Sequence, residues 1–358
     1  MAEISDSVKL MDTGKRNASE RDRQTENSQL VGPAGLDIGT SNIVLAKMRS
    51  GAVQTVKQLN AFFAVPRSKF TGKVFAKNEI MYFARNGQFY IIGNSSDMFA
   101  ATFNSSTRRP IEGGLLSPKE DEGVNVIAAI MKTMLPPPKK PGEVIAFSVP
   151  GEPVDTRISV LYHETVMKRT LEGMGYFPIS VNEGLAVITA ELSNDNYTGI
   201  GISMGGGMCN VCLAYMAVPI LSYSIQKGGD YIDSMVGRTL GESQTKIKLI
   251  KEKELSLTRE PRNRVETALQ IFYDDLLLHL TQSLEQVLAS SDKVPRFAKP
   301  VPLVISGGGA LANGLKERFE RALKNVSLPV QISSVRIAED PLNSTAKGAL
   351  YMALSEES

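Results

Sequence analysis

The pattern of hydrophobic and polar positions divides the chain into a polar beginning and a long region of short strands and helices. Residues 1–31 contain hardly any apolar residue after Met11, so they cannot bury enough surface to offset the entropy lost on ordering. We therefore predict a disordered polar tail over residues 1–31. Its few apolar residues near the start suit a short membrane-touching helix, but their acidic neighbours favour a solvated tail.

A unit of strand, tight turn and strand occurs twice in the pattern. Apolar residues on both sides of Gly39–Asn42 predict the first unit, with glycine and small polar residues in the turn. The second unit runs from a strand over Tyr197–Met204 through Gly205–Gly207 into a strand over Cys209–Met216. Two such units far apart in the chain predict two lobes of similar construction.

The remaining pattern alternates strands with helices, which indicates an α/β protein with buried strands. Apolar residues every three or four positions from Val265 to Val287 predict a long amphipathic helix. A third glycine cluster, Gly307–Ala310, follows a strand at Leu303–Ser306 and leads into a helix at Leu315–Leu323. The other expected elements are strands at Phe62–Val65, Phe89–Gly93, Val144–Val149 and Ile179–Asn182, a helix from there through Ala190, and helices at Val124–Met134, Asp155–Gly173 and Ser344–Leu354.

Composition and charge narrow the class of protein. With 358 residues and 42% hydrophobic content, the chain can form more than one core. Its net charge of +2, from 40 basic and 38 acidic residues, gives no overall attraction to nucleic acid or anionic lipid, so we expect no nucleic-acid partner. Two cysteines, no apolar leader pattern and apolar runs far below the roughly 20 residues of a membrane span predict a cytoplasmic protein without a transmembrane segment.

Glycine turns after strands can bind phosphate, because backbone N–H groups reach an anion where no Cβ stands in the way. A single turn of this kind is better explained as a plain hairpin. Two turns in tandem lobes, with a third glycine cluster that opens a helix toward a ligand, favour a phosphate site instead. The P-loop pattern Gly-x-x-x-x-Gly-Lys-Ser/Thr does not occur in the sequence.

Six short motifs, in this order, resemble the actin superfamily and within it the MreB and MamK bacterial actins, over about residues 35–354. The motifs are Leu36–Asn42, Asn182–Gly184, Gly205–Gly207, Gly228–Asp230, Gly307–Ala310 and Ala338–Leu342. The resemblance implies a two-lobed α/β actin-like ATPase fold, in which duplicated ribonuclease-H-like domains enclose a nucleotide cleft. The implied parts are lobe I over 32–193 with a small insert at about 60–112, lobe II over 194–330 with a short insert at about 229–264, and a C-terminal segment over 331–358 whose helix packs back on lobe I.

The resemblance also implies the cofactors, ATP and Mg²⁺, and the residues that hold them. The two phosphate loops would consist of Gly39, Thr40, Ser41, Asn42, Gly205, Gly206 and Gly207. The adenosine side would consist of Thr245, Lys248, Gly307, Gly308, Gly309, Ala310 and Leu311. Asp37 would be the carboxylate near the divalent ion. Glu183 would orient the attacking water, although a carboxylate at the start of a helix can also serve the helix alone.

The second loop departs from the family pattern, which is Asp-Ile-Gly-x-Gly-Thr-Thr-Asp. This chain has Ser203 in the first position and Met208 in the sixth, and both carboxylates and both threonines are replaced. Serine carries no charge for a metal and methionine offers no hydroxyl to a phosphate, so hydrolysis would be slow while binding survives. The stretch Gly229–Val265 is also short for the subdomain that family members insert there, so polymer contacts would differ.

Cys209 and Cys212 form a Cys-x-x-Cys pattern, which also occurs in redox and zinc sites. Both lie on one predicted strand, where residues three apart point to opposite faces, and the sequence has no second pair for a metal. We therefore expect two structural cysteines. His163 and His279 are each isolated on a predicted helix and are expected to be packing or surface residues.

These features predict a cytoplasmic, cytoskeletal actin-like protein that binds ATP and polymerises into filaments that organise cell shape or position an organelle. Polymerisation is implied by the resemblance alone. The expected partners are further copies of the chain and organelle- or membrane-associated adaptor proteins. The alternative is a non-hydrolysing nucleotide-binding adaptor or scaffold of the same fold, of the pilus or division type. A sugar or acetate kinase would need a substrate-side base, and a heat-shock chaperone would need a peptide-binding domain; the sequence indicates neither.

Overall fold

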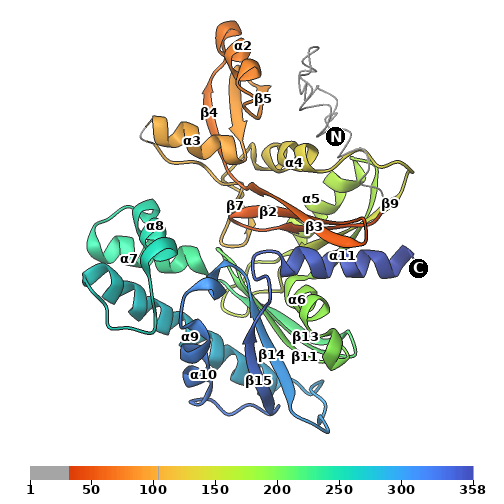
Figure 1. Cartoon of the computed structure of the whole chain (residues 1–358), viewed down its shortest axis with the longest axis vertical. Helices are drawn as coiled ribbons and strands as arrows, with labels where there is room; N and C mark the ends of the chain where they lie inside the picture. Colours follow the sequence, from red (N-terminus) through yellow and green to blue (C-terminus); the bar gives the residue numbers. More distant parts are fainter. Residues whose placement is uncertain (1–31, 104, 358) are drawn as a thin grey trace.

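Two lobes, each built on a five-stranded sheet, form the molecule (Figure 1). The computed structural model describes residues 32–103 and 105–357, so the tail predicted over residues 1–31 lies outside it. From edge to edge, the lobe I sheet consists of β10 (Tyr176–Asn182), β9 (Glu143–Val149), β1 (Ala34–Ile38), β2 (Asn42–Arg49) and β3 (Ala52–Leu59). The lobe II sheet consists of β13 (Val218–Ile225), β12 (Cys209–Tyr215), β11 (Gly199–Met204), β14 (Val301–Ser306) and β15 (Ile332–Ile337).

The two sheets repeat one topology. In each sheet a short turn joins two antiparallel strands, β1 to β2 in lobe I and β11 to β12 in lobe II. A third antiparallel strand, β3 or β13, pairs on one side, and two parallel strands extend the sheet on the other. The repeated strand order confirms the duplicated α/β architecture.

Two helices between the sheets join the lobes (Figure 1). α6 (Glu183–Glu191) follows the lobe I strand β10 but packs against β11 and β12 of lobe II. α11 (Ser344–Glu357) follows β15 of lobe II but packs against β1 and β9 of lobe I. The two helices touch at Gly348, where a Cβ would collide with the Ala186 carbonyl. The lobes are therefore coupled through a tight helix crossing.

The other helices pack on the sheets and fill one core in each lobe. α4 (Gly123–Met134) contributes Ile127 and Ile130 to the lobe I core. The 27-residue α9 (Arg264–Ser290) contributes Leu269, Leu276 and Leu280 to the lobe II core, as its amphipathic pattern predicts. α5 (Leu161–Glu172) packs in lobe I and α10 (Leu315–Leu323) in lobe II. None of the helices in the described ranges is long and apolar enough to cross a bilayer.

Each lobe carries an insert. In lobe I it is a three-stranded sheet in the order β4-β6-β5 with two helices, and it occupies one end of the long axis (Figure 1). In lobe II it is a contacting pair of helices, α7 and α8. The remaining bounds are β4 (Phe62–Pro66), α2 (Lys69–Lys77), β5 (Tyr82–Arg85), β6 (Gln88–Ile92), α3 (Asn94–Thr102), β7 (Ile111–Glu112), β8 (Leu115–Leu116), η1 (Ser193–Asp195), α7 (Gly229–Leu240), α8 (Gln244–Glu254) and η2 (Gly308–Leu311).

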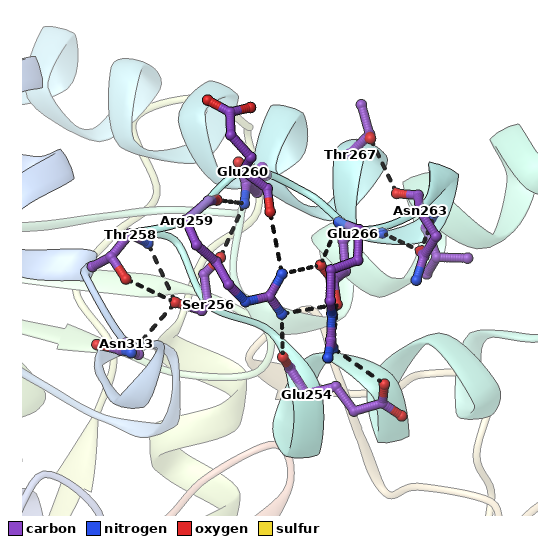
Figure 2. A network of polar contacts seen from close by, with 12 residues as sticks. Glu254, Ser256, Thr258, Arg259, Glu260, Asn263, Glu266, Thr267 and Asn313 are labelled. Atoms are coloured by element: carbon purple, nitrogen blue, oxygen red, sulfur yellow. Dashed lines mark hydrogen bonds and ion pairs between the residues drawn. The ribbon is translucent and has the colours of Figure 1, made fainter.

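A buried carboxylate fixes the return from the lobe II insert to the core (Figure 2). Glu266 is fully buried in the first turn of α9 and accepts hydrogen bonds from Arg259 Nη1 at 2.6 Å and Arg262 Nε at 2.8 Å. Asn263 caps the helix, because its Oδ1 accepts from the Val265 and Glu266 N–H groups, both at 3.0 Å. The Arg259 and Arg262 hydrogen bonds hold the pKa of Glu266 well below its usual range.

Several elements differ from the sequence prediction. The helix expected over Asp155–Gly173 begins only at Leu161, because the preceding segment crosses to lobe II, where the Val154 N–H donates to the Ser224 carbonyl at 2.9 Å. The third glycine cluster opens only the 3-10 turn η2, and α10 begins after Gly314. The hydrophobic pattern does not predict β3, β13, β15, α2, α3 or α8, which are short or largely exposed, and it does not predict α7 either.

The Cys-x-x-Cys pair is structural, as expected. Cys209 packs in the lobe II core, whereas Cys212 packs on the other face of β12 against the residues around α6. Both thiols are free and buried, and burial raises the pKa of Cys212 to about 12. His163 is likewise a packing residue, because it is buried, its Nδ1 accepts from the Leu116 N–H, and burial lowers its pKa to about 4.

Candidate functional site

The first glycine turn joins β1 to β2 and leaves backbone donors free. The Gly39 N–H donates to the Asn42 carbonyl at 3.0 Å, which closes the turn. Asn60 holds the turn in place, because its Nδ2 donates to the Gly39 carbonyl at 2.9 Å and its N–H to the Ser41 carbonyl at 3.0 Å. Within residues 32–103 and 105–357, the N–H groups of Thr40 and Ser41 donate to no protein acceptor, so they are available to an anion.

The second turn repeats this geometry between β11 and β12. The Gly205 N–H donates to the carbonyl three residues later at 2.9 Å. The first turn of α7 holds the loop, because the Gly229 N–H donates to the Gly205 carbonyl at 3.0 Å and the Asp230 N–H to the Gly206 carbonyl at 2.8 Å. In the part of the chain that the structure describes, the Gly206 and Gly207 N–H groups have no protein acceptor. The Gly205 and Gly206 carbonyls are therefore hydrogen-bonded to α7, whereas the Gly206 and Gly207 amides are not.

The two loops contact each other from opposite lobes. A Cβ on Gly206 would lie 2.8 Å from Ser41 Oγ, and a Cβ on Gly207 would lie 2.7 Å from Thr40 Oγ1. A Cβ on Gly207 would also collide with the backbone nitrogen of Gly114, so this position requires glycine, whereas a Cβ on Gly206 would displace the Ser41 hydroxyl. Amides and hydroxyls from both lobes meet at this point.

A cavity of about 560 Å³ lies beside the loops, a size typical of small-molecule sites. The expected site residues that line it are Asp37, Gly39, Thr40, Ser41, Asn42, Glu183, Gly205, Gly206, Gly207, Lys248, Gly307, Gly308, Gly309 and Leu311. Two expected residues do not. Ala310 is buried in the lobe II core, and Thr245 lines a neighbouring groove of about 1110 Å³ between the inserts.

One face of α8 and its C-cap line the cavity. Lys248, Lys251, Glu252 and Leu255 lie there at helical spacing. Thr245 lies one turn before Lys248, toward the start of the helix, and therefore lies outside the cavity. Lys251 and Glu252 were not among the predicted site residues, although their spacing of three and four residues from Lys248 is the signal that identifies this face.

An acidic centre lies where the first loop, α6 and β11 meet. Ser148 Oγ donates to Asp37 Oδ1 at 2.7 Å, and Ser203 Oγ donates to Glu183 Oε2 at 2.9 Å. Burial raises the pKa of Asp37 to about 6, against the lowering effect of the Ser148 hydrogen bond. Burial, followed by the charge of Asp37, raises the pKa of Glu183 to about 8. Without a compensating cation, both carboxyl groups therefore keep their protons to a higher pH than usual.

The donor set fits a divalent cation that arrives with a phosphate ligand. Asp37 and Glu183 line one cavity, and each desolvated carboxylate would be stabilised by a positive charge. Within the described residues, no group of three or more His, Cys, Asp or Glu side chains could hold a metal alone. Mg²⁺ characteristically takes one or two carboxylates and completes its shell with phosphate oxygens and water. The site fits that mode of binding.

Comparison with known proteins assigns the family. A family model described as Volactin matches residues 33–353. The chain belongs to the Volactin family. No curated protein sequence matches it.

Solved structures share the fold. The MamK double helical filament is 19% identical, with a TM-score of 0.68 over 90% of this chain and 98% of that one. MreB 5 of Spiroplasma citri bound to AMPPNP is 15% identical, with a TM-score of 0.65 over 91% and 96%. The ethanolamine utilization protein EutJ from Carboxydothermus hydrogenoformans is 15% identical, with a TM-score of 0.52 over 94% and 100%. These likenesses confirm the two-lobed actin-like fold that the motifs predict.

Met208 has a structural role in this Volactin-family chain. It is buried with Leu115 and Val160, and its Cγ would lie 2.5 Å from a Cβ on Gly114. Gly114 lies in the turn between β7 and β8. Met208 therefore docks this hairpin on the second loop, a role that the sequence pattern could not show.

Two polar contacts beside the cavity were also missed. Arg109 Nη1 donates to both carboxylate oxygens of Asp230, at 3.0 and 2.9 Å, and so links the lobe I insert to α7. Lys251 Nζ donates to the Gly229 carbonyl and to Asp233 Oδ2, both at 2.8 Å. Asp233 is buried, its Oδ1 has no hydrogen-bond partner among the residues that the structure describes, and burial raises its pKa to about 6. These contacts join residues far apart in the chain, so no local signal predicts them.

Proposed function

We propose that this Volactin-family protein binds ATP with Mg²⁺ between its lobes and polymerises into a cytoplasmic filament. One observation carries the proposal: two glycine loops from opposite lobes meet, with amides that have no acceptor among the described residues, beside a cavity that two half-buried carboxylates also line. Oriented amides of this kind form an anion site, and the carboxylates suit the accompanying cation. A ligand held by both lobes would couple nucleotide state to lobe closure.

The residues divide into three roles in this proposal. The amides of Thr40, Ser41, Gly206 and Gly207 bind phosphate oxygens. Asp37 and Glu183 hold the divalent ion, which neutralises phosphate charge when bound. The cavity face of α8 and the η2 turn bind the adenosine.

Glu183 is also the proposed positioning group for the attacking water. It must be ionised for that role, and the adjacent cation would favour ionisation. The Ser203 hydroxyl supplies no negative charge, so we expect slow turnover.

The comparisons support the filament part of the proposal. The MamK structure is a double helical filament, and the MreB 5 structure contains AMPPNP. Both likenesses extend over at least 90% of this chain. The proposed filament organises cell shape or positions an organelle, through organelle- or membrane-associated adaptor proteins.

Sedimentation and negative-stain electron microscopy test the filament. We expect pelleted filaments with ATP or AMPPNP and Mg²⁺, and soluble protein without nucleotide. Phosphate release measured in the same samples should be slow, and Glu183→Gln should abolish it while AMPPNP-dependent pelleting remains. Monomers at every nucleotide and salt condition would contradict the filament proposal.

A nucleotide-binding adaptor without turnover is the second candidate. Ser203 in place of a carboxylate and the burial of Met208 under the hairpin favour it, as does the likeness to EutJ, whose name is that of a utilization protein and not of a filament. Calorimetric titration with ATP separates the candidates. Tight binding with neither phosphate release nor filaments supports the adaptor.

A further inference from the structure

The outer face of α2 combines exposed apolar side chains with exposed lysines. The Phe70 side chain is 78% exposed and that of Val74 is 40% exposed, one helical turn apart. Lys69, Lys73 and Lys77 form a parallel row beside them, and all three are exposed. No ion pair joins these lysines to an acid in the described ranges, and α2 itself contains no acidic residue.

The helix that presents this face is firmly anchored. Phe75, on its inner side, is buried against the rings of Tyr82, Phe89 and Phe99, with centroid separations of 5.2, 5.6 and 5.2 Å. The Ser68 hydroxyl caps the helix by accepting from the Thr71 N–H at 2.9 Å. The outer face is therefore a fixed surface and not a fraying end.

The position of α2 makes the face accessible to a flat partner. Figure 1 shows α2 at the extreme end of the long axis, beyond the three-stranded sheet of the lobe I insert. It is remote from the two glycine loops. Contact there would leave the cleft and the rest of the molecule free.

We propose that this face of α2 docks on a lipid bilayer that contains anionic lipid. The three lysines complement anionic headgroups, and Phe70 with Val74 inserts at the boundary between headgroups and acyl chains. The net charge of the whole chain, +2, conceals this local concentration of positive charge. A single-stranded nucleic acid would satisfy the lysines and stack a base on Phe70, but it would leave the aliphatic Val74 without a partner, whereas a bilayer takes up both apolar side chains.

Tryptophan fluorescence provides a direct test, because the full chain contains no tryptophan. Phe70→Trp introduces one fluorophore on the outer face of α2. With vesicles of phosphatidylcholine and phosphatidylglycerol in equal parts, at low salt and without nucleotide, we expect a blue shift and quenching by brominated lipid. Vesicles of phosphatidylcholine alone should cause a much smaller change. The absence of nucleotide makes the result independent of the filament proposal.

Charge reversal measures the lysine contribution in vesicle sedimentation. Each lysine close to an anionic surface strengthens binding about fivefold, so Lys69→Glu, Lys73→Glu and Lys77→Glu together should weaken it at least about a hundredfold. The matched control carries Lys253→Glu, Lys299→Glu and Lys324→Glu, three exposed lysines elsewhere, and should bind nearly as the wild type does. Phe70→Ser should weaken binding, whereas Phe177→Ser, at another exposed phenylalanine, should not.

Four results would overturn the proposal. These are no binding of the wild type to anionic vesicles, equal binding to neutral vesicles, equal loss in the α2 and control charge variants, and a blue shift of Phe70→Trp that depends on protein concentration without vesicles. The last result would show that a second copy covers the face. Retained thermal unfolding midpoints show that the variants are folded.

Discussion

At the acidic centre, the residue at position 203 determines how many negative charges lie beside Glu183. The Ser203 hydroxyl donates to Glu183 Oε2, so it stabilises the ionised glutamate without adding charge. A carboxylate at this position would add a third negative group beside Asp37 and Glu183. It would strengthen cation binding, but without a cation the three carboxylates would repel one another.

Ser203→Asp should therefore make the protein depend on Mg²⁺. We expect phosphate release at saturating ATP and Mg²⁺ to rise roughly tenfold, because the cation would be held more firmly near the developing charge. The thermal midpoint should fall in EDTA and recover with Mg²⁺. Ser203→Asn, which adds no charge, is the matched control and should show neither effect. A thermal midpoint of Ser203→Asp that is the same in EDTA and in Mg²⁺ would contradict the assignment of the centre as a cation site.

The same centre predicts a pH dependence of stability. Without a cation, the folded-state pKa is about 8 for Glu183 and about 6 for Asp37, both above the value near 4 of an unfolded chain. Between about pH 4 and pH 8 the folded state binds more protons than the unfolded state, so the free energy of unfolding falls as pH rises. Glu183→Gln cannot titrate and should remove most of this fall above pH 6.

Urea unfolding in EDTA at pH 6 and pH 8 measures the effect. The wild type should lose about 1–2 kcal/mol more than Glu183→Gln over this interval, given roughly 1.4 kcal/mol per pH unit for one proton. Mg²⁺ with nucleotide should reduce the loss in the wild type, because a bound cation favours the ionised forms. Parallel pH slopes in the two proteins would show that Glu183 titrates normally.

At the scale of elements, the Glu266 network predicts a local contribution to stability. Glu266 is buried, whereas Arg259 and Arg262 are partly exposed, so solvent screens their attraction. Glu266→Gln should lower the free energy of unfolding by about 2 kcal/mol at pH 7. Because the folded-state pKa of Glu266 is lowered, this contribution is present above the unfolded value near 4 and is lost as pH falls below it.

Denaturant unfolding of Glu266→Gln at pH 7 and below pH 4 checks the sign of this effect. The difference from the wild type should shrink at the lower pH. Glu254→Gln is the control, because Glu254 is half exposed and lies 3.6 Å from Arg262 (Figure 2). Glu254→Gln should lower the free energy of unfolding only slightly. If both variants lowered the free energy of unfolding equally, the stabilising contact would lie elsewhere.

The elements also show what a sequence can predict. The buried strands, α9 and α10 follow from apolar periodicity, and the two glycine turns follow from their composition. β3 could not be predicted in this way, because most of its residues are exposed or half-buried. The start of α5 was wrong because Val154 pairs with Ser224 in the other lobe, and a tertiary hydrogen bond leaves no periodic signal.

The candidate site likewise contains some residues that the sequence predicts and others that it does not. Residues on the loops were predictable because glycine and small polar residues mark them locally, and 14 residues of the expected set line the cavity. Arg109, Asp233 and Lys251 were not, since each acts through a partner from a distant part of the chain or a separate helix. Thr245 lines the neighbouring groove, one helical turn of α8 before Lys248.

At the scale of the whole molecule, the lobes are joined in two different ways. The crossing of α6 and α11 brings backbones into contact, so it resists bending. Beside the cavity, the lobes are joined by the Arg109–Asp230 ion pair, in which both side chains are 24% exposed, and by the hairpin on Met208. An ion pair that water can reach breaks far more easily than a buried backbone contact. Opening should therefore occur on the Arg109 side, while the helix crossing stays in contact.

This asymmetry predicts that Arg109 controls nucleotide exchange. Arg109→Ala removes the guanidinium that bridges from the lobe I insert to Asp230, so the open state should become more populated and bound nucleotide should leave several-fold faster, as expected when about 1 kcal/mol of a partly exposed pair is lost. Stopped-flow release of a fluorescent ATP analogue from monomeric protein measures the rate. Arg108→Ala is the matched control, because Arg108 pairs with Glu120 within lobe I and should leave release unchanged. If both variants release nucleotide at the wild-type rate, the ion pair does not restrain the lobes.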